Sequence, residues 1–203
     1  ISKGWIELDA FYANTLTELC TTEELVRLTA DSRRIASECN VKLQSAMITD
    51  IPGWSWGIVP VLAKSGVKYL SLGTNSGDRI GSTIKDWGDR PFYWVSPSGE
   101  EKILCWIHEK AYSLFPTGLK YDELKFRMDE GKIIGYMNEL YSNNYPYEII
   151  TLRYNIGSDN GPTDPTLSNA VKQWNEKYVT PKVKLMTVSE SFSEFEKRHG
   201  GDI

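Results

Sequence analysis

Residues 41–74, VKLQSAMITDIPGWSWGIVPVLAKSGVKYLSLGT, contain the pattern that decides the fold. Val41 to Ile48 is mostly apolar and β-rich, which is typical of a strand covered on both faces. Trp56 to Ser65 carries apolar residues at helical spacing, and Gly66 supplies a left-handed stop. Val67 to Leu72 is again strand-like. The stretch therefore predicts one β-α-β crossover.

An acidic turn separates the first strand of this crossover from its helix. The strand stops at Thr49-Asp50, and Pro52 and Gly53 predict the turn. The carboxyl ends of parallel strands are where α/β folds place ligand chemistry. An aspartate can also simply brace a turn. We favour a functional role for Asp50 because Trp54 and Trp56 share the same loop and further acidic turns follow later.

The composition is that of a soluble globular protein. The chain has 203 residues, of which 40% are hydrophobic and 25% charged, with a net charge of −4. We therefore expect 1–203 to form a single domain, or part of a larger one. Basic residues are scattered without a run of five, so no nucleic-acid or anionic-membrane partner is expected.

Further sequence features concern cysteines and processing. Cys20, Cys39 and Cys105 have neither an even number nor a C-x-x-C spacing, so we expect small core residues and no disulfide set or zinc knuckle. No run of eighteen apolar residues and no signal-peptide pattern is present. The chain begins at Ile1 without methionine, and we expect it to be excised from a longer protein.

The β-α pattern recurs before and after the central crossover. Gly4 to Leu8 predicts a short strand, and the capping box Thr21–Glu24 opens a helix that reaches about Glu38. Pro91 to Val95 and Ile103 to Ile107 flank a Ser-Pro-Ser-Gly turn and predict an inserted antiparallel hairpin.

The second half of the chain continues the alternation. The predicted elements are a helix over 121–141, a strand over 147–154, a helix over 166–178, a strand over 183–186 and a helix over 187–199. Strands that alternate with helices predict an α/β fold with a mainly parallel sheet and flanking helices.

Several polar residues follow the predicted strands and are expected at one rim of the sheet. They are Asp9, Asp50, Asn75, Asp78, Asn155, Asp159 and Asn160. Carboxylates at one rim suit either a nucleophile with a general acid for glycosidic cleavage, or oxygen ligands for a hard metal. Neither His108, at the end of a hairpin strand, nor His199, at a helix end, favours a Ser-His-Asp triad. Nucleotide-binding and zincin motifs are absent from the sequence.

Three segments resemble the N-terminal catalytic domain of the glycoside hydrolase family 38 α-mannosidases. They are MITDIPGWSWGIVPVLAKSGVKYLSLG, LRYNIGSDNG and YVTPKVKLMTVSESFSEFEKR, and the similarity extends over most of residues 4–199. The first resembles the D-P-F-G-H-S segment that carries the family's nucleophile, although this chain has D-I-P-G-W. The resemblance implies an incomplete, seven-stranded type of β/α barrel, with Asp50 as nucleophile and metal ligand and Asp159 as the acid/base or its neighbour.

The resemblance also implies a zinc ion. The family holds zinc with a His-x-Asp pair, the nucleophile and a later histidine, and only Asp50 matches one of these ligands here. Either the remaining ligands belong to the intact parent, which we favour, or this branch has abandoned zinc. Another divalent cation, bound by Asp50 with Asp9 or Asp78, is a further option.

Three functions stay open. The first is retaining, α-mannosidase-like hydrolysis of a carbohydrate, with this fragment alone expected to be inactive. Its substrate-binding candidates are Trp54, Trp56, Asn75, Asp78, Arg153, Asn155 and Asn160. The second is a polysaccharide deacetylase-like carbohydrate esterase, which needs an Asp-His-His metal set. The third is a non-catalytic carbohydrate-binding domain that stacks sugars on Trp54, Trp56, Trp87, Trp94 and Trp106.

Overall fold

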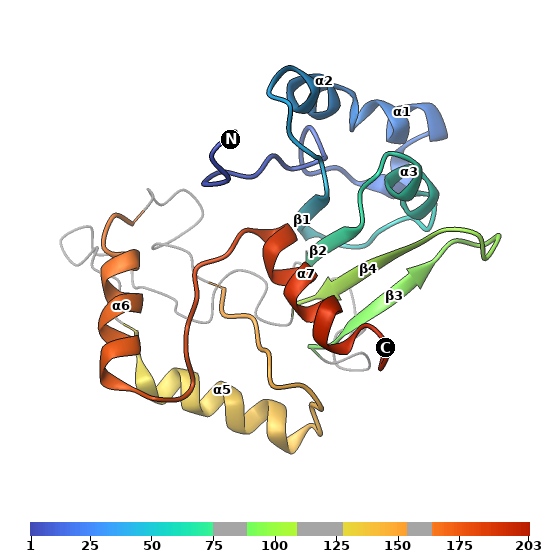
Figure 1. Cartoon of the computed structure of the whole chain (residues 1–203). Helices are drawn as coiled ribbons and strands as arrows, with labels where there is room; N and C mark the ends of the chain where they lie inside the picture. The colour runs from blue at the N-terminus through green and yellow to red at the C-terminus, as the bar shows by residue number, and fades with distance from the viewer. Residues whose placement is uncertain (75–88, 109–127, 154–163) are drawn as a thin grey trace. The chain divides into compact units, whose positions relative to one another are not determined.

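A computed structural model describes residues 1–74, 89–108, 128–153 and 164–203 (Figure 1). The chain divides into two compact units, one formed by Ile1–Ala111 with Thr187–Ile203 and the other by Tyr112–Met186. The expectation that 1–203 is one domain stays a prediction.

The first unit is built on a mainly parallel sheet. Its four described strands are β1 Ser45–Ile51, β2 Tyr69–Thr74, β3 Pro91–Val95 and β4 Lys102–Ile107. They lie in the order β1-β2-β4-β3. β2 pairs in parallel with both β1 and β4, whereas β3 pairs antiparallel with β4 at the edge. The predicted α/β class with a mainly parallel sheet is confirmed.

The central crossover is present as predicted. Helix α3, Ile58–Lys64, connects β1 to β2, and the chain leaves it through Gly66 at a φ of +86°. A side chain at that backbone angle would be strained, so glycine is needed there.

Both faces of the sheet are covered, which explains why its strands are almost continuously apolar. One face forms a single core with α3, and its residues are Ala46, Ile48, Leu70, Leu72, Ile103, Cys105 and Ile107 from the strands with Ile58, Val59, Val61 and Leu62 from the helix. Helix α7, Val188–His199, lies against the other face (Figure 1). There Trp106 packs against Phe192 and Phe195, with ring centroids 6.0 and 5.2 Å apart.

Polar contacts fix the first turn of α7. Thr187 and Glu190 form the predicted capping box. The Glu7 carboxylate accepts hydrogen bonds from the Ser45 hydroxyl at 2.6 Å and from the Ser189 backbone N–H at 3.0 Å. A negative charge at a helix N-terminus is favourable. Glu7 therefore joins the start of α7 to the start of β1.

A second carboxylate fixes the middle of α7. The hydroxyls of Tyr69 on β2 and Tyr93 on β3 each donate a 2.9 Å hydrogen bond to Glu196, one to each carboxylate oxygen. Tyr69 and Tyr93 both pair with Leu104 of β4, so the two hydroxyls stand in one row across the sheet. Burial, together with the bond to Glu196, raises the pKa of Tyr93 to about 12, so this hydroxyl stays a donor at neutral pH.

The helix predicted from Thr21 to Glu38 is two helices. They are α1, Thr22–Arg27, and α2, Ala30–Glu38. The Leu28 carbonyl accepts from the Tyr12 backbone N–H at 2.8 Å, and the Thr29 hydroxyl bonds back to the Val26 carbonyl at 3.1 Å. These bonds divert the carbonyls that a continuous helix would use. A short 3-10 helix, η1, precedes them at Thr17–Leu19.

Two predicted elements differ from the structure: the strand over Gly4 to Leu8, and the hairpin over 91–107, which was expected to project from the sheet. Gly4 to Leu8 forms no strand, and Ala10 alone bonds its backbone N–H to β1, at the Ser45 carbonyl. The hairpin exists, but it does not project, because β4 lies inside the sheet beside β2. Ile103 to Ile107 are all buried, which a free arm could not achieve.

In the second unit, two helices pack on each other through Ile133 and Trp174. They are α5, Glu130–Ser142, and α6, Leu167–Lys177. Residues 121–127 of the predicted longer helix lie outside the described residues. None of the described helices is long and apolar enough to span a membrane.

The two strands predicted in this unit are not found in its described residues. The Ile149 carbonyl, within the first, accepts from the Tyr145 hydroxyl at 2.7 Å. In the second, the Asn175 side chain bonds both the backbone N–H and the carbonyl of Val183, at 2.9 and 2.7 Å. Side chains thus occupy backbone groups that a sheet ladder would need.

The Glu196 contacts predict a specific cost of mutation. Glu196→Ala leaves two tyrosine hydroxyls without their acceptor and is expected to lower the free energy of unfolding by about 2 kcal/mol. Glu194→Ala on the same helix removes a partly exposed pair with Arg198 and is expected to cost roughly 0.5 kcal/mol. Chemical denaturation measures both.

A double-mutant cycle between Glu196→Ala and Tyr93→Phe tests the contact itself. The two effects should be clearly less than additive, because each change removes the same hydrogen bond. Additive effects would show that Glu196 acts through packing of its stem.

Candidate active site

Asp50 occupies an irregularity at the carboxyl end of β1. Thr49 pairs with Gly73 and Ile51 with Thr74, so Asp50 is the extra residue of a β-bulge. Its φ is +62°, and its side chain is exposed while Ile48 and Ile51 on either side are buried. Bulges often redirect a side chain next to an active site.

The backbone angle of Asp50 has an energetic cost. A left-handed conformation costs a non-glycine residue roughly 1–2 kcal/mol, although aspartate tolerates it better than most. Such strain persists only where the surrounding structure imposes it, and it is concentrated at functional sites. The position of Asp50 is therefore set by its surroundings.

The N-terminal segment supplies those surroundings. The Asn14 side-chain oxygen accepts from the Thr49 backbone N–H at 3.2 Å. On the far side of the bulge, the buried Thr17 hydroxyl accepts from the Ser55 backbone N–H at 2.7 Å. Residues before and after Asp50 are thus held by one segment, which makes the loop a fixed support for its carboxylate.

The two tryptophans of this loop differ in exposure. Trp54 packs against the core, and its indole nitrogen is buried with no hydrogen-bond partner in the described part of the chain. Trp56 is 57% exposed, and its N–H donates to the Val95 carbonyl at 2.6 Å. Trp56 therefore offers an accessible, anchored ring of the kind that suits a sugar face.

Asp9 does not lie at the carboxyl rim. Its carboxylate accepts from the backbone N–H of Phe11 at 2.8 Å, and it also bonds the backbone N–H of Met47, in the first half of β1. Asp9 thereby caps the outer edge of β1, where an unpaired N–H would otherwise be exposed. Burial raises the pKa of Asp9 to about 6, against the lowering effect of these two hydrogen bonds.

One cluster at the carboxyl end of β4 was missed by the sequence reasoning. Asp89, Trp106 and His108 are all buried. Asp89 accepts from the Trp106 indole N–H at 2.8 Å, and the His108 Nδ1 lies 3.7 Å from the same oxygen. His108 also stacks on Trp106, with ring centroids 5.2 Å apart. The only signal in the sequence was the two-residue spacing of Trp106 and His108 on one strand face.

The other predicted site residues have mixed outcomes. Asn75, Asp78, Asn155, Asp159 and Asn160, together with Trp87, lie outside the described residues. Arg153 belongs to the second unit and is half-buried. Trp106 is 1% exposed and offers no face for sugar stacking, whereas Trp94 is partly buried against the core. The cysteines are free thiols, and Cys105 alone is fully buried.

The described residues do not fit a metal. Within them, no three His, Cys, Asp or Glu side chains come together as a catalytic zinc requires. A zinc ion therefore has one matched ligand here, Asp50.

These features define a mixed α/β domain in which an exposed aspartate with a strained backbone lies at the carboxyl end of a parallel strand. The family model "Glycosyl hydrolases family 38 N-terminal domain" matches residues 1–203, and the chain belongs to this family. A comparison with curated proteins gives no match. Among solved structures, a 4-alpha-glucanotransferase from Thermococcus litoralis is similar over 92% of this chain, with 17% identity and a TM-score of 0.48. The chain spans 26% of that protein's length.

The backbone angle at position 50 can be tested by substitution. Asp50→Gly and Asp50→Ala both remove the carboxylate, so their difference isolates the backbone. Asp50→Gly is expected to be more stable by about 1 kcal/mol, because glycine adopts a positive φ without strain. At Met47, an exposed position of the same strand, the order should reverse. The same order at both positions would contradict the strain at Asp50.

The raised pKa of Asp9 predicts a pH effect with a definite sign. The folded state holds the proton up to about pH 6, whereas the unfolded state releases it near 3.8, so ionised Asp9 destabilises the fold above pH 6. Relative to wild type, Asp9→Asn should gain about 2 kcal/mol of stability between pH 4.5 and pH 7.5. Thermal or urea unfolding at both pH values measures it, and parallel pH profiles would refute it.

Proposed function

We propose that this chain is part of a retaining, α-mannosidase-like glycoside hydrolase in which Asp50 is the nucleophile. The observation that carries the proposal is the placement of Asp50, exposed at a strained bulge that the N-terminal segment holds on both sides. Family membership supports the reaction class. The α-mannoside specificity rests on the resemblance alone.

The proposed reaction has two steps. An Asp50 oxygen attacks the anomeric carbon and forms a glycosyl ester, while the bond to the leaving oxygen breaks and Asp159 gives that oxygen a proton. Asp159 then takes a proton from water, whose oxygen attacks the same carbon and releases Asp50. The two inversions retain the anomeric configuration. For this mechanism the two carboxyl groups should be about 5 Å apart, whereas roughly 6.5–9.5 Å would suit inversion.

The surroundings of Asp50 suit this task. A nucleophile must be held at a fixed distance from the anomeric carbon, and the hydrogen bonds from Thr49 to Asn14 and from Ser55 to Thr17 restrain both sides of the loop. Trp56, exposed and anchored by its N–H, is the proposed platform for a sugar ring. Asn75, Asp78, Arg153, Asn155 and Asn160 remain candidate substrate ligands.

Two finer features are also proposals. The four described strands would belong to an incomplete β/α barrel of the seven-stranded type completed by the intact parent. Zinc, or another divalent cation, would be bound there with Asp50 as one ligand and the rest supplied by the parent; when bound, such an ion stabilises developing negative charge. This segment alone would then turn over substrate poorly.

No observation specifically favours either alternative, the carbohydrate-binding domain or the deacetylase-like esterase. A binding domain built on five tryptophans loses Trp106 to the core, and Trp54 and Trp94 are partly buried against it. A deacetylase needs an Asp-His-His set, and no cluster of three such ligands occurs in the described ranges.

Chemical rescue tests the role of Asp50 in the full-length parent. With aryl α-mannosides, Asp50→Gly should lower kcat by about a thousandfold or more, since a nucleophile cannot be replaced by water in the same geometry. Added azide should restore cleavage and yield a glycosyl azide of inverted anomeric configuration. Glycine also suits the positive φ at this position, which keeps the fold intact.

Matched controls separate the roles. Asp159→Asn should slow the reaction most for poor leaving groups, and Asp31→Asn, an exposed change on α2, should leave it unchanged. Chelator should abolish turnover if zinc is bound as proposed. Chelator-insensitive hydrolysis that survives Asp50→Asn would refute the assignment.

A further inference from the structure

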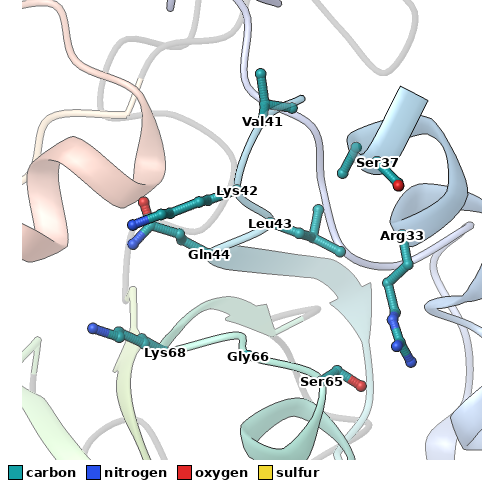
Figure 2. A pocket seen from close by; sticks show the side chains of 10 residues that line it. Arg33, Ser37, Val41, Lys42, Leu43, Gln44, Ser65, Gly66 and Lys68 are labelled. Atoms are coloured by element: carbon teal, nitrogen blue, oxygen red, sulfur yellow. The ribbon is translucent and has the colours of Figure 1, made fainter. Parts of the chain in front are cut away.

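A hollow of about 400 Å³ lies at the amino end of the parallel strands, away from the Asp50 bulge (Figure 2). Its walls come from α2 and from the segments that lead into β1 and β2. The residues that matter here are Arg33, Ser37, Lys42, Gln44, Ser65 and Lys68. The volume is within the range of small-molecule sites, roughly 300–1,000 Å³.

The hollow is strongly basic although the chain as a whole is acidic. Arg33, Lys42 and Lys68 line it, and no carboxylate does. In the described part of the chain, none of the three forms an ion pair or a side-chain hydrogen bond. The chain carries a net charge of −4, so a hollow lined by three cations and no carboxylate is opposite in sign to the chain as a whole.

Neighbouring basic residues are neutralised. Arg34, next to Arg33 on α2, pairs with Glu38 at 2.9 Å and Asp31 at 3.7 Å. Lys64, at the end of α3, pairs with Glu101 at 2.9 Å. The three cations that line the hollow thus lack the carboxylate partners that these two neighbours have.

Helix ends do not account for these cations. The C-termini of α2 and α3 border the hollow, and each contributes about half a negative charge, or about one in total against three positive charges. The last carbonyls are also bonded already, since Ala36 accepts from the Val41 backbone N–H and Leu62 from that of Val67. About two positive charges remain without a partner.

We propose that this hollow binds a ligand with two or more sulfate or phosphate groups, of about the size of a disaccharide. Figure 2 shows Lys42, Gln44 and Lys68 on one side and Arg33, Ser37 and Ser65 on the other, so the charges suit separate anionic groups rather than one ion. Arginine binds such oxyanions in a bidentate way, and the amide and hydroxyls can bond the intervening polar atoms. The inference does not depend on the proposed hydrolase activity.

Titration calorimetry on the full-length protein tests this site, with a trisulfated disaccharide and tripolyphosphate as probes and with inorganic sulfate and phosphate as single-group references. At least one multiply charged probe should bind with 1:1 stoichiometry, at least tenfold tighter than the single ions. Affinity should fall between 20 and 150 mM salt, because the cations are exposed. A preference between the two probes identifies the sulfate or the phosphate source.

Variants locate the binding. Arg33→Ala, Lys42→Ala and Lys68→Ala should each weaken it about fivefold or more, because each removes a charge-assisted contact. Arg34→Ala and Lys64→Ala remove the same charge from paired neighbours and should leave the affinity unchanged, with folding of all five checked by circular dichroism. Absence of binding by both charged probes, or equal weakening by the control variants, would overturn the proposal.

Discussion

The constraint on which the first unit depends is the need to cover both faces of its sheet. The strands carry apolar residues on both faces of the sheet. A face left exposed to water would lose the stabilising free energy that its burial provides. Helix α3, which directly follows β1 and precedes β2 in the chain, covers one face. The other face depends on α7, which Glu7 fixes at its first turn and the Tyr69–Glu196 contact fixes at its middle.

This cover also explains how the bulge at Asp50 is tolerated. Ile48 and Ile51 stay buried on either side of it, so the irregularity is confined to one residue and the pairing with β2 resumes at once. In addition, Asn14 and Thr17 accept hydrogen bonds from the backbone on either side of the bulge. The candidate site thus combines a rigid base with one residue that departs from regular geometry, as preorganised carboxylates require.

Local signals predicted the elements whose formation depends on local contacts. The β-α-β crossover follows from apolar periodicity and from Gly66, and α7 follows from the capping box at Thr187. The errors concern partners distant in sequence. Nothing near Ile103–Ile107 indicates that β4 pairs with β2, and nothing near Leu28 indicates that its carbonyl bonds Tyr12. For the same reason Asp50 was found from its place after a strand, whereas its positive φ and the Asp89–His108 neighbourhood, which depend on tertiary contacts, were not.

The position of α7 in the chain has a consequence for biosynthesis. The strands that it covers end at Ile107, and its own residues begin at Val188, so the ribosome completes a whole second unit before the cover exists. During that interval the aromatic face with Tyr69 and Trp106 has no α7 to shield it, which is the kind of surface that chaperones recognise and that aggregates when it meets its own copies. The long sequence separation also places the docking of α7 late in folding. The entropy cost of closing the intervening loop is incurred before the contacts of α7 with the sheet contribute any stabilising free energy. The aromatic face is thus most vulnerable while the second unit is being synthesised, until α7 emerges and completes the core.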